Sequence, residues 1–118
     1  QSGKYRVKKV VCAVDCGLVI NPDIVRAQME GGIGYGLSPA LMSAITIDKG
    51  RVVETNFDAH RVLRMQDMPE IETYIVSSSD APTGVGEPAT PVITAAVANA
   101  LFSKSHVMQS RLPLNLEA

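Results

Sequence analysis

The fold is decided by residues 10–23, which read VVCAVDCGLVINPD. Residues 10–14 are continuously apolar and rich in β-branched side chains, and this pattern predicts a strand covered on both faces. Asn21 supplies a helix cap, Pro22 fits the first helical position, and Asp23 places a carboxylate in the first turn. The stretch therefore predicts a strand followed closely by a helix.

The helix that begins there is predicted to carry its interior face at helical spacing. The residues on that face are Ile24, Ala27, Gln28 and Gly31. The glycines that follow are Gly31, Gly32, Gly34 and Gly36. Each costs roughly 0.5 to 1 kcal/mol in a helix relative to alanine, so another element or a ligand is expected to approach the backbone closely. Pro39 predicts a break, and hence two helical pieces.

The second half of the chain predicts further strands and one more helix. Residues 45–53 read as a hairpin with Gly50 in the turn, and residues 60–65 and 71–76 read as two strands. A helix opens at Thr90 and Pro91, with an apolar stripe at Ile93, Ala96, Val97, Ala100 and Leu101. We expect an α+β domain over residues 1–118: a mixed sheet of about four to five strands, a glycine-rich helix pair and a carboxyl-terminal helix. The tail from residue 106 is expected to run along the surface.

Composition limits the partners. Hydrophobic residues make up 46% and charged residues 19%, as in an ordinary folded soluble chain. The formal charge is −1, which offers no footprint for nucleic acid, and the basic residues Lys4, Arg6, Lys8 and Lys9 fit the solvated face of an entering strand. The sequence shows no membrane span and no targeting segment, so cytoplasm and periplasm both stay open.

Neither cysteine is expected to form a disulfide or a metal site. If residues 12–16 are extended, Cys12 and Cys16 lie roughly 13 Å apart, whereas a disulfide needs Cα atoms within about 7 Å. Together with His60 and His106 they lack zinc-site spacing. We predict free thiols and no metal ligand from this chain.

The segment around Glu87 is the strongest candidate for chemistry. Gly84 and Gly86 allow the backbone to turn sharply beside a ligand, and they present one carboxylate just before a helix. The residues alone leave two interpretations open. Glu87 is either a favourable charge at a helix start or a general base in a pocket. The segment lacks the phosphate-loop pattern.

Several ordered motifs together resemble a known family. They are residues 15–17 (DCG), 19–22 (VINP), 27–32 (AQMEGG) and 84–88 (GVGEP), supported by residues 56–57, 61–65 and 69–72. In this order the motifs resemble the large, molybdopterin-binding subunit of the molybdenum hydroxylases, the xanthine dehydrogenase and aldehyde oxidase family. Residues 56–57, 61–65 and 69–72 resemble the isoquinoline 1-oxidoreductase beta-subunit type specifically. The resemblance spans roughly residues 5–113 and corresponds to the carboxyl-terminal part of that subunit.

The resemblance implies a reaction and a site. In the family, an electron-poor carbon of an N-heterocycle or aldehyde is hydroxylated with oxygen from water. The glutamate matched by Glu87 acts as the general base. Gln28, Gly31 and Gly32 match the segment that touches the cofactor, and Gly84 and Gly86, just before the base, are expected to bind it as well. The implied cofactor is molybdopterin cytosine dinucleotide with molybdenum, and iron–sulfur clusters are implied on a small partner subunit.

The resemblance also implies what this chain needs from other parts. We expect the upstream part of the large subunit, the iron–sulfur subunit and a small-molecule substrate as partners. The 118-residue chain alone is expected to bind no molybdenum, to show no turnover and to expose surface prone to self-association. The alternative is a small α+β binding or scaffolding module without catalysis. Substrate identity and electron acceptor stay open.

Overall fold

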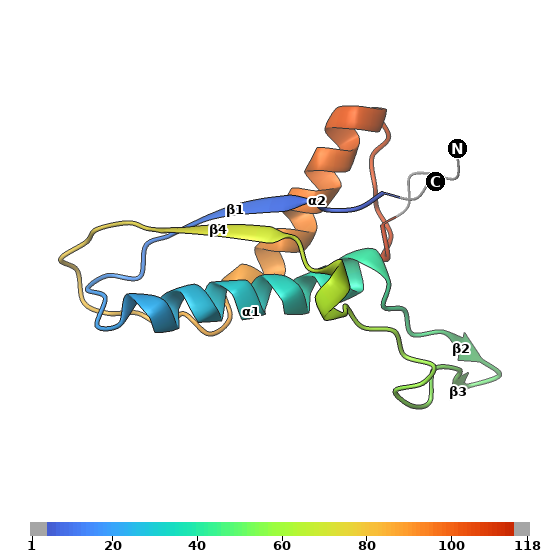
Figure 1. Ribbon diagram of the computed structural model, residues 1–118. Helices are drawn as coiled ribbons and strands as arrows, with labels where there is room; N and C mark the ends of the chain where they lie inside the picture. The colour runs from blue at the N-terminus through green and yellow to red at the C-terminus, as the bar shows by residue number, and fades with distance from the viewer. Residues whose placement is uncertain (1–4, 115–118) are drawn as a thin grey trace.

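The computed structural model describes residues 5–114, which form an α+β fold. In chain order the elements are β1 (Lys9–Val14), α1 (Pro22–Leu41), β2 (Ile47–Asp48), β3 (Arg51–Val52), the 3-10 helix η1 (Met65–Asp67), β4 (Glu70–Ile75) and α2 (Ala89–Ser105). Figure 1 shows the paired strands β1 and β4 lying above α1, with α2 crossing α1 and the β2–β3 hairpin projecting away from them.

Strands β1 and β4 form a parallel pair, with Lys9 opposite Glu70 and Val14 opposite Ile75. A parallel pair needs a crossover, and α1 lies within it. Cover on both faces was the wrong prediction, because burial alternates along β1 and Val11 is 63% exposed. Only the face that carries Val10, Cys12 and Val14 packs against the core.

The predicted single sheet of four to five strands is not what forms. Within residues 5–114 there are two separate two-stranded sheets, β1–β4 and the antiparallel hairpin β2–β3. The hairpin itself is confirmed, and Lys49 and Gly50 both have positive φ in its turn. No strand forms at residues 60–65. The Arg61 carbonyl accepts from Ser43 Oγ and the Leu63 N–H donates to Ser38 Oγ, so this backbone bonds to side chains instead of a strand partner.

Helix α1 starts as predicted but does not break. The Asn21 side chain accepts hydrogen bonds from the N–H groups of Asp23 and Ile24, and Pro22 opens the helix. The expected helix pair is a single helix, because Pro39 removes one hydrogen bond only two residues before the helix ends at Leu41. A break at Pro39 would therefore have avoided the loss of only one helical hydrogen bond.

The two helices cross at glycines of α1. A Cβ on Gly36 would lie 2.3 Å from the Thr90 carbonyl oxygen, and one on Gly32 would lie 3.0 Å from Ala89 Cβ. The hydroxyl groups of Thr90 and Thr94 donate to the carbonyls of Gly32 and Gly36 at 3.3 and 3.2 Å. Small residues therefore set this crossing.

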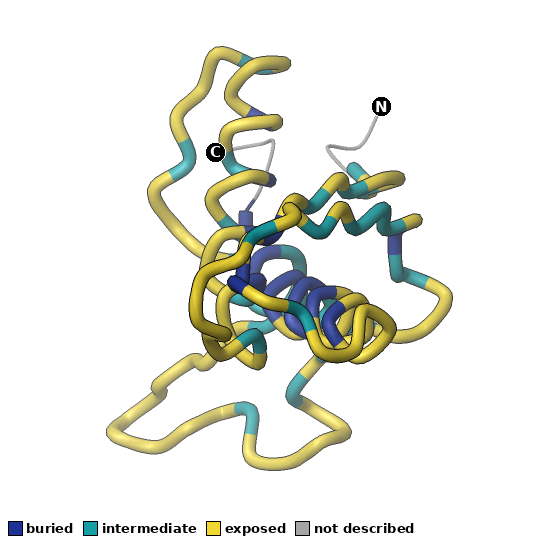
Figure 2. Tube along the Cα trace, turned by 90° about the vertical axis from the view of Figure 1, so that its left-hand side faces the viewer, coloured by how far each residue is buried: buried dark blue, intermediate teal, exposed yellow. Residues whose placement is uncertain are grey.

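This crossing also turns α1 away from its predicted orientation. The residues that α1 buries are Val25, Met29, Gly32, Ile33, Gly36, Leu37 and Ala40, whereas Ile24, Ala27, Gln28 and Gly31 are exposed. The expectation that Gln28 faces the interior was wrong, because the longer apolar stripe, one residue further along the chain, packs under β1–β4 and against α2. Figure 2 shows this buried side of α1 at the centre of the molecule.

Helix α2 and the tail complete the core. The helix begins at Ala89 with Pro88 as its cap, not at Thr90, and it buries Ile93, Val97 and Leu101, whereas Ala96 and Ala100 stay exposed. The tail was expected on the surface, and residues 106–113 are exposed or half-buried. Only Leu114, the last described residue, is buried at 6% exposure, and its N–H donates to the carbonyl of Ala40 near the end of α1. Cys12 and Cys16 are free thiols, as predicted.

Candidate functional site

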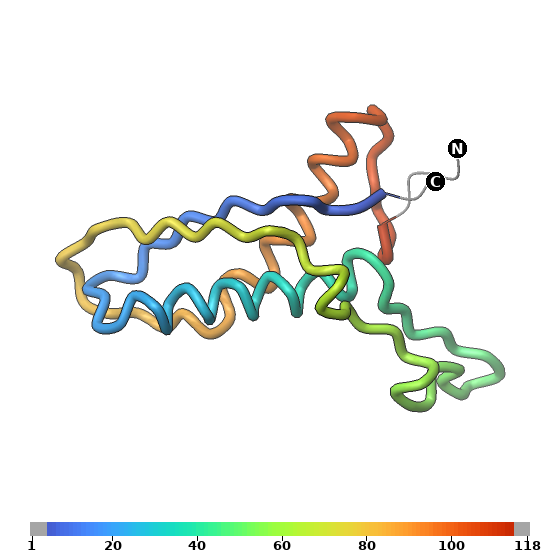
Figure 3. Tube along the Cα trace, viewed as in Figure 1, coloured from blue at the N-terminus to red at the C-terminus, as the bar shows by residue number. Residues whose placement is uncertain are grey.

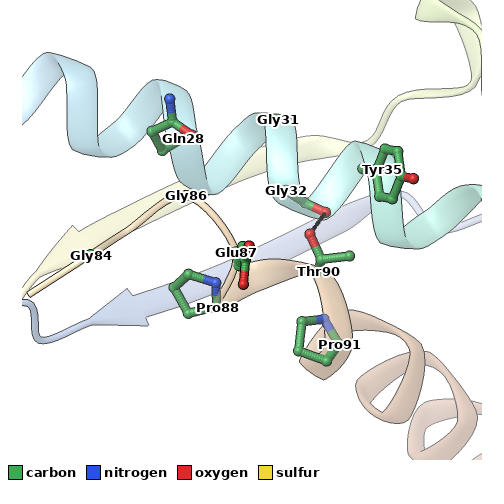
Figure 4. Close-up of a pocket in the computed structure, with 10 residues that line it drawn as sticks. All are labelled: Gln28, Gly31, Gly32, Tyr35, Gly84, Gly86, Glu87, Pro88, Thr90 and Pro91. Carbon is green, nitrogen blue, oxygen red and sulfur yellow. Dashed lines mark hydrogen bonds between the residues drawn. The ribbon is translucent and has the colours of Figure 1, made fainter.

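An open cavity of about 1090 Å³ lies where α1 faces the segment leading into α2. Its lining consists of Gln28, Gly31, Gly32, Tyr35, Gly84, Gly86, Glu87, Pro88, Thr90 and Pro91. Figure 4 shows Gln28, Gly31, Gly32 and Tyr35 following one another along α1, with Glu87 on the adjoining segment. The structure thus brings all six sequence-predicted site residues to one cavity.

The loop that carries Gly84 and Glu87 is held in place by the end of β1. Leu18 N–H donates to the Asp80 carbonyl and Thr83 N–H to the Cys16 carbonyl, both at 2.9 Å. Gly17 makes this approach possible, because its φ is +72° and a Cβ there would lie 2.3 Å from the Ala81 oxygen. In Figure 3 the segment after β4 runs back beside the start of α1.

The turn before the helix is also fixed locally. The side chain of Asp15 accepts from Gly17 N–H at 3.1 Å, as expected for an aspartate that caps a turn at a strand end. The DCG motif is therefore a structural support that positions the loop before Glu87, and its residues do not line the cavity.

The glycines of the site differ in what they provide. A Cβ on Gly31 or Gly84 would meet nothing within 4 Å, and one on Gly86 would meet only the Gln28 side-chain oxygen at 3.9 Å. These three leave open space in the cavity. Gly32 is buried, and its missing side chain makes room for α2.

Backbone donors are available on only one side of the cavity. Gly31 and Gly32 lie inside α1, where helical hydrogen bonds occupy their N–H groups. Within residues 5–114, the N–H groups of Gly84 and Gly86 make no hydrogen bond. A ligand would therefore find free donors on the loop and an amide at Gln28.

Glu87 and Gln28 are the two sequence-predicted side chains at the cavity that carry polar groups. Both residues are exposed. The Glu87 backbone carbonyl accepts from Thr90 N–H at 3.0 Å, which holds the residue in the turn before α2. Within the described part of the chain the Glu87 carboxylate makes no hydrogen bond or ion pair, so both oxygens can accept a proton or a donor.

Sequence reasoning missed part of the lining. Tyr35 lies seven residues after Gln28 on the same side of α1 and is 75% exposed. Pro88, Thr90 and Pro91 close the opposite wall. The one available signal was the spacing of residues 28, 31 and 35, since i, i+3 and i+7 share one helix face.

Other candidates stay outside this cavity. His60 lies beside the hairpin, and His106 caps the end of α2. Among residues 5–114, no three His, Cys, Asp or Glu side chains gather so that they could hold a metal ion. Within the same range, no helix is long and apolar enough to cross a bilayer. Lys4 of the basic cluster lies outside the described residues, and Arg6, Lys8 and Lys9 are exposed.

The fold and cavity define a class: an α+β domain with a large open cavity between α1 and the segment that leads into α2. The profile of the molybdopterin cofactor-binding domain matches residues 1–69, more than half of the chain, and the chain belongs to that family. The matched part contains Gln28, Gly31 and Gly32. The loop with Glu87 lies beyond it.

Individual proteins extend the similarity. Isoquinoline 1-oxidoreductase subunit beta of Brevundimonas diminuta is 48% identical over 81 residues, which covers 69% of this chain and 10% of that protein. A membrane-bound aldehyde dehydrogenase of Gluconacetobacter polyoxogenes, whose name specifies pyrroloquinoline quinone, is 34% identical over 113 residues. This match covers 96% of this chain and 15% of that protein. The chain thus spans a small part of the curated relatives it matches.

The crystal structure of quinoline 2-oxidoreductase from Pseudomonas putida 86 superposes with a TM-score of 0.76 at 26% identity. The match covers 92% of this chain and 15% of that one. It supports the α+β architecture described above.

Proposed function

We propose that this chain forms one wall of the cofactor and substrate site of a molybdenum-dependent oxidoreductase, in which Glu87 is the general base. The enzyme hydroxylates an electron-poor carbon of an N-heterocycle or an aldehyde with oxygen from water. The observation that carries the proposal is that Glu87 and Gln28, distant in sequence, line the same cavity. Family membership supplies the cofactor class.

The residues present fit a molybdenum-pterin cofactor. The cavity of about 1090 Å³ is slightly larger than most small-molecule sites, which measure roughly 300 to 1000 Å³. Gly31, Gly84 and Gly86 leave it free of side chains, and the loop offers unpaired N–H donors. Because the described residues contain no metal-binding cluster, the pterin and not this chain would hold the metal.

The residues take separate roles in this proposal. When bound, the cofactor supplies the two-electron redox chemistry and an oxygen nucleophile derived from water. The Gln28 amide and the N–H groups of Gly84 and Gly86 bind and orient the polar edge of the pterin. Glu87 removes a proton from the nucleophile, which requires a carboxylate oxygen within about 2.6 to 3.2 Å of it.

Several finer points belong to the proposal as well. The relatives' names, isoquinoline 1-oxidoreductase and quinoline 2-oxidoreductase, favour an N-heterocycle, and the aldehyde dehydrogenase favours an aldehyde. We propose the cytosine dinucleotide form of the cofactor, iron–sulfur clusters on a small partner subunit, and one domain over residues 1–118. The chain alone is expected to bind no molybdenum and to show no turnover.

The deciding experiment replaces Glu87 with Gln in the complete enzyme. Turnover should fall by at least a hundredfold, since general bases contribute about 10² to 10⁴. Molybdenum and pterin content and thermal stability should stay at the parent level. Glu70→Gln is the matched control, because Glu70 lies on β4, away from the cavity, and its side chain is 67% exposed.

Two outcomes would overturn the proposal. Retained turnover in Glu87→Gln would return Glu87 to the role of a charge at a helix start. Absence of molybdenum and pterin from the purified parent enzyme would favour a binding or scaffolding module, and quinone analysis of the same sample would test the cofactor that the aldehyde dehydrogenase relative's name specifies.

A further inference from the structure

The chain exposes far more surface than a compact protein of its size. Its accessible surface is 8543 Å², whereas roughly 6200 Å² is expected for 12.6 kDa. Its radius of gyration is 16.5 Å, against roughly 13.5 Å for a compact domain of this length. Some of this surface must therefore come from a part that does not pack against the body.

That part is residues 43–63, which we call the hairpin arm. It projects from the end of α1 in Figure 1, and Figure 2 draws it almost entirely as exposed. None of its residues is buried, and its two strands have only two residues each. Hairpins this short are marginal in water without further packing.

Several apolar side chains of this arm are exposed to solvent. The large exposed ones are Ile45 (61%), Ile47 (70%), Val52 (44%), Val53 (52%) and Phe57 (85%). Its formal charges cancel, because Lys49, Arg51 and Arg61 balance Asp48, Glu54 and Asp58. Clustered apolar exposure without net charge is typical of a surface that another apolar surface covers.

We infer that the hairpin arm docks onto an apolar surface of the rest of the large subunit. The inference rests on the proposed function in one respect, namely that the chain is part of such a subunit. The relatives support this occupant, because this chain spans only 10 to 15% of their length and most of their polypeptide lies outside it. A second copy of the chain is the competing occupant.

The same cover would also close the cofactor cavity. A groove of about 740 Å³ separates the arm from α1, and it shares Gly31 and Tyr35 with the cavity that Glu87 lines. A segment that docks on the arm would therefore do two things: it would stabilise the arm, and it would exclude water from the cavity that Glu87 lines.

The test measures whether Phe57 is covered in the complete large subunit. A Phe57→Cys variant is treated with a polar maleimide, and labelling is read at the peptide level in the native and the unfolded protein. We expect native labelling at least tenfold slower than unfolded labelling. Native labelling at the unfolded rate, or protection that is lost when oligomers dissociate into single large subunits, would overturn the inference.

A second pair of variants removes dependence on the thiol. Phe57→Asp should lower the Tm of the complete subunit by several degrees, whereas Phe57→Leu should leave it near the parent value. Phe57 is 85% exposed in this chain, so a large difference must come from contacts with other parts of the subunit. An unchanged Tm in both variants contradicts docking. Neither the labelling rate nor the Tm depends on turnover. Failure of the Glu87 proposal, which is measured by turnover, can therefore be distinguished from failure of the docking inference.

Discussion

At the scale of single residues, two glycines of α1 should respond in opposite ways to the same substitution. Gly36→Ala places a methyl group 2.3 Å from the Thr90 carbonyl oxygen, and backbone must shift to admit it. We expect a loss of about 1 to 3 kcal/mol in the free energy of unfolding. Gly31→Ala meets nothing within 4 Å and should gain roughly 0.5 to 1 kcal/mol from helix propensity.

Thermal unfolding of the cofactor-free subunit checks both variants. The pair controls itself, because both are glycine-to-alanine changes within one helix. Equal effects would mean that α1 and α2 do not cross where the structure has them. The sequence pattern predicted that another element or a ligand approaches these glycines. It offered no means to distinguish Gly36 from Gly31, because the difference depends on the side from which α2 approaches α1.

The thiol of Cys12 provides a pH test of the inner face of β1. Burial raises the pKa of this thiol above its usual value. The reactive thiolate should therefore appear only at higher pH than in a free cysteine, and alkylation should be slower at neutral pH. Alkylation rates from pH 7 to 10 measure this, with Cys12→Ser as background. A midpoint at or below that of free cysteine would place Cys12 in solvent.

At the scale of elements, the helix crossing depends on hydroxyl groups that reach glycine carbonyls. Thr94→Val keeps the shape of the side chain but removes the bond to the Gly36 carbonyl. We expect a loss of about 0.5 to 1.5 kcal/mol in unfolding free energy. Ser103→Val, on the exposed side of α2, should change stability by less than about 0.5 kcal/mol. Chemical denaturation measures the unfolding free energy of both variants. Similar losses in the two would show that the Thr94 hydroxyl group makes no particular contribution to the helix crossing.

Elements with strong local signals could be predicted from the sequence. The strands predicted at residues 10–14 and 71–76 form at residues 9–14 and 70–75, and the hairpin turns at Gly50. Both helices begin within two residues of their predicted starts. Two of the errors share one cause. The strand at 60–65 and the inward orientation of Gln28 depended on tertiary partners that local periodicity does not contain. The break at Pro39 failed for a local reason, because the helix ends only two residues later.

At the scale of the whole molecule, the site depends on two segments that only the fold brings together. Residues 28–35 and 84–91 are far apart in sequence, and no local pattern indicates that they meet. The resemblance grouped Gln28, Gly31, Gly32 and Glu87, but it did not identify Tyr35, because an exposed aromatic residue carries no distinctive pattern. The contacts of Gly17 with the loop at residue 81 explain how the segments are held in register.

The assembled cavity can be tested by filling it. Gly31→Leu sends a side chain into open space of the cavity, whereas Ala27→Leu adds the same bulk one turn earlier on the exposed side of α1, outside the cavity lining. In the complete enzyme, Gly31→Leu should reduce bound pterin severalfold, while Ala27→Leu should retain it. Gly31→Leu raises helix propensity and Ala27→Leu lowers it only slightly, so both proteins should stay folded.

Pterin released from the purified proteins by denaturation and measured by fluorescence gives the comparison, independently of turnover. Circular dichroism verifies that helix content is unchanged. If Gly31→Leu retains full pterin, the cofactor cannot lie against this face of α1, and Gln28, which shares that face, would lose its proposed contact as well. Equal loss in both variants would instead indicate that α1 as a whole packs against another part of the subunit, in which case the cavity would be an interface.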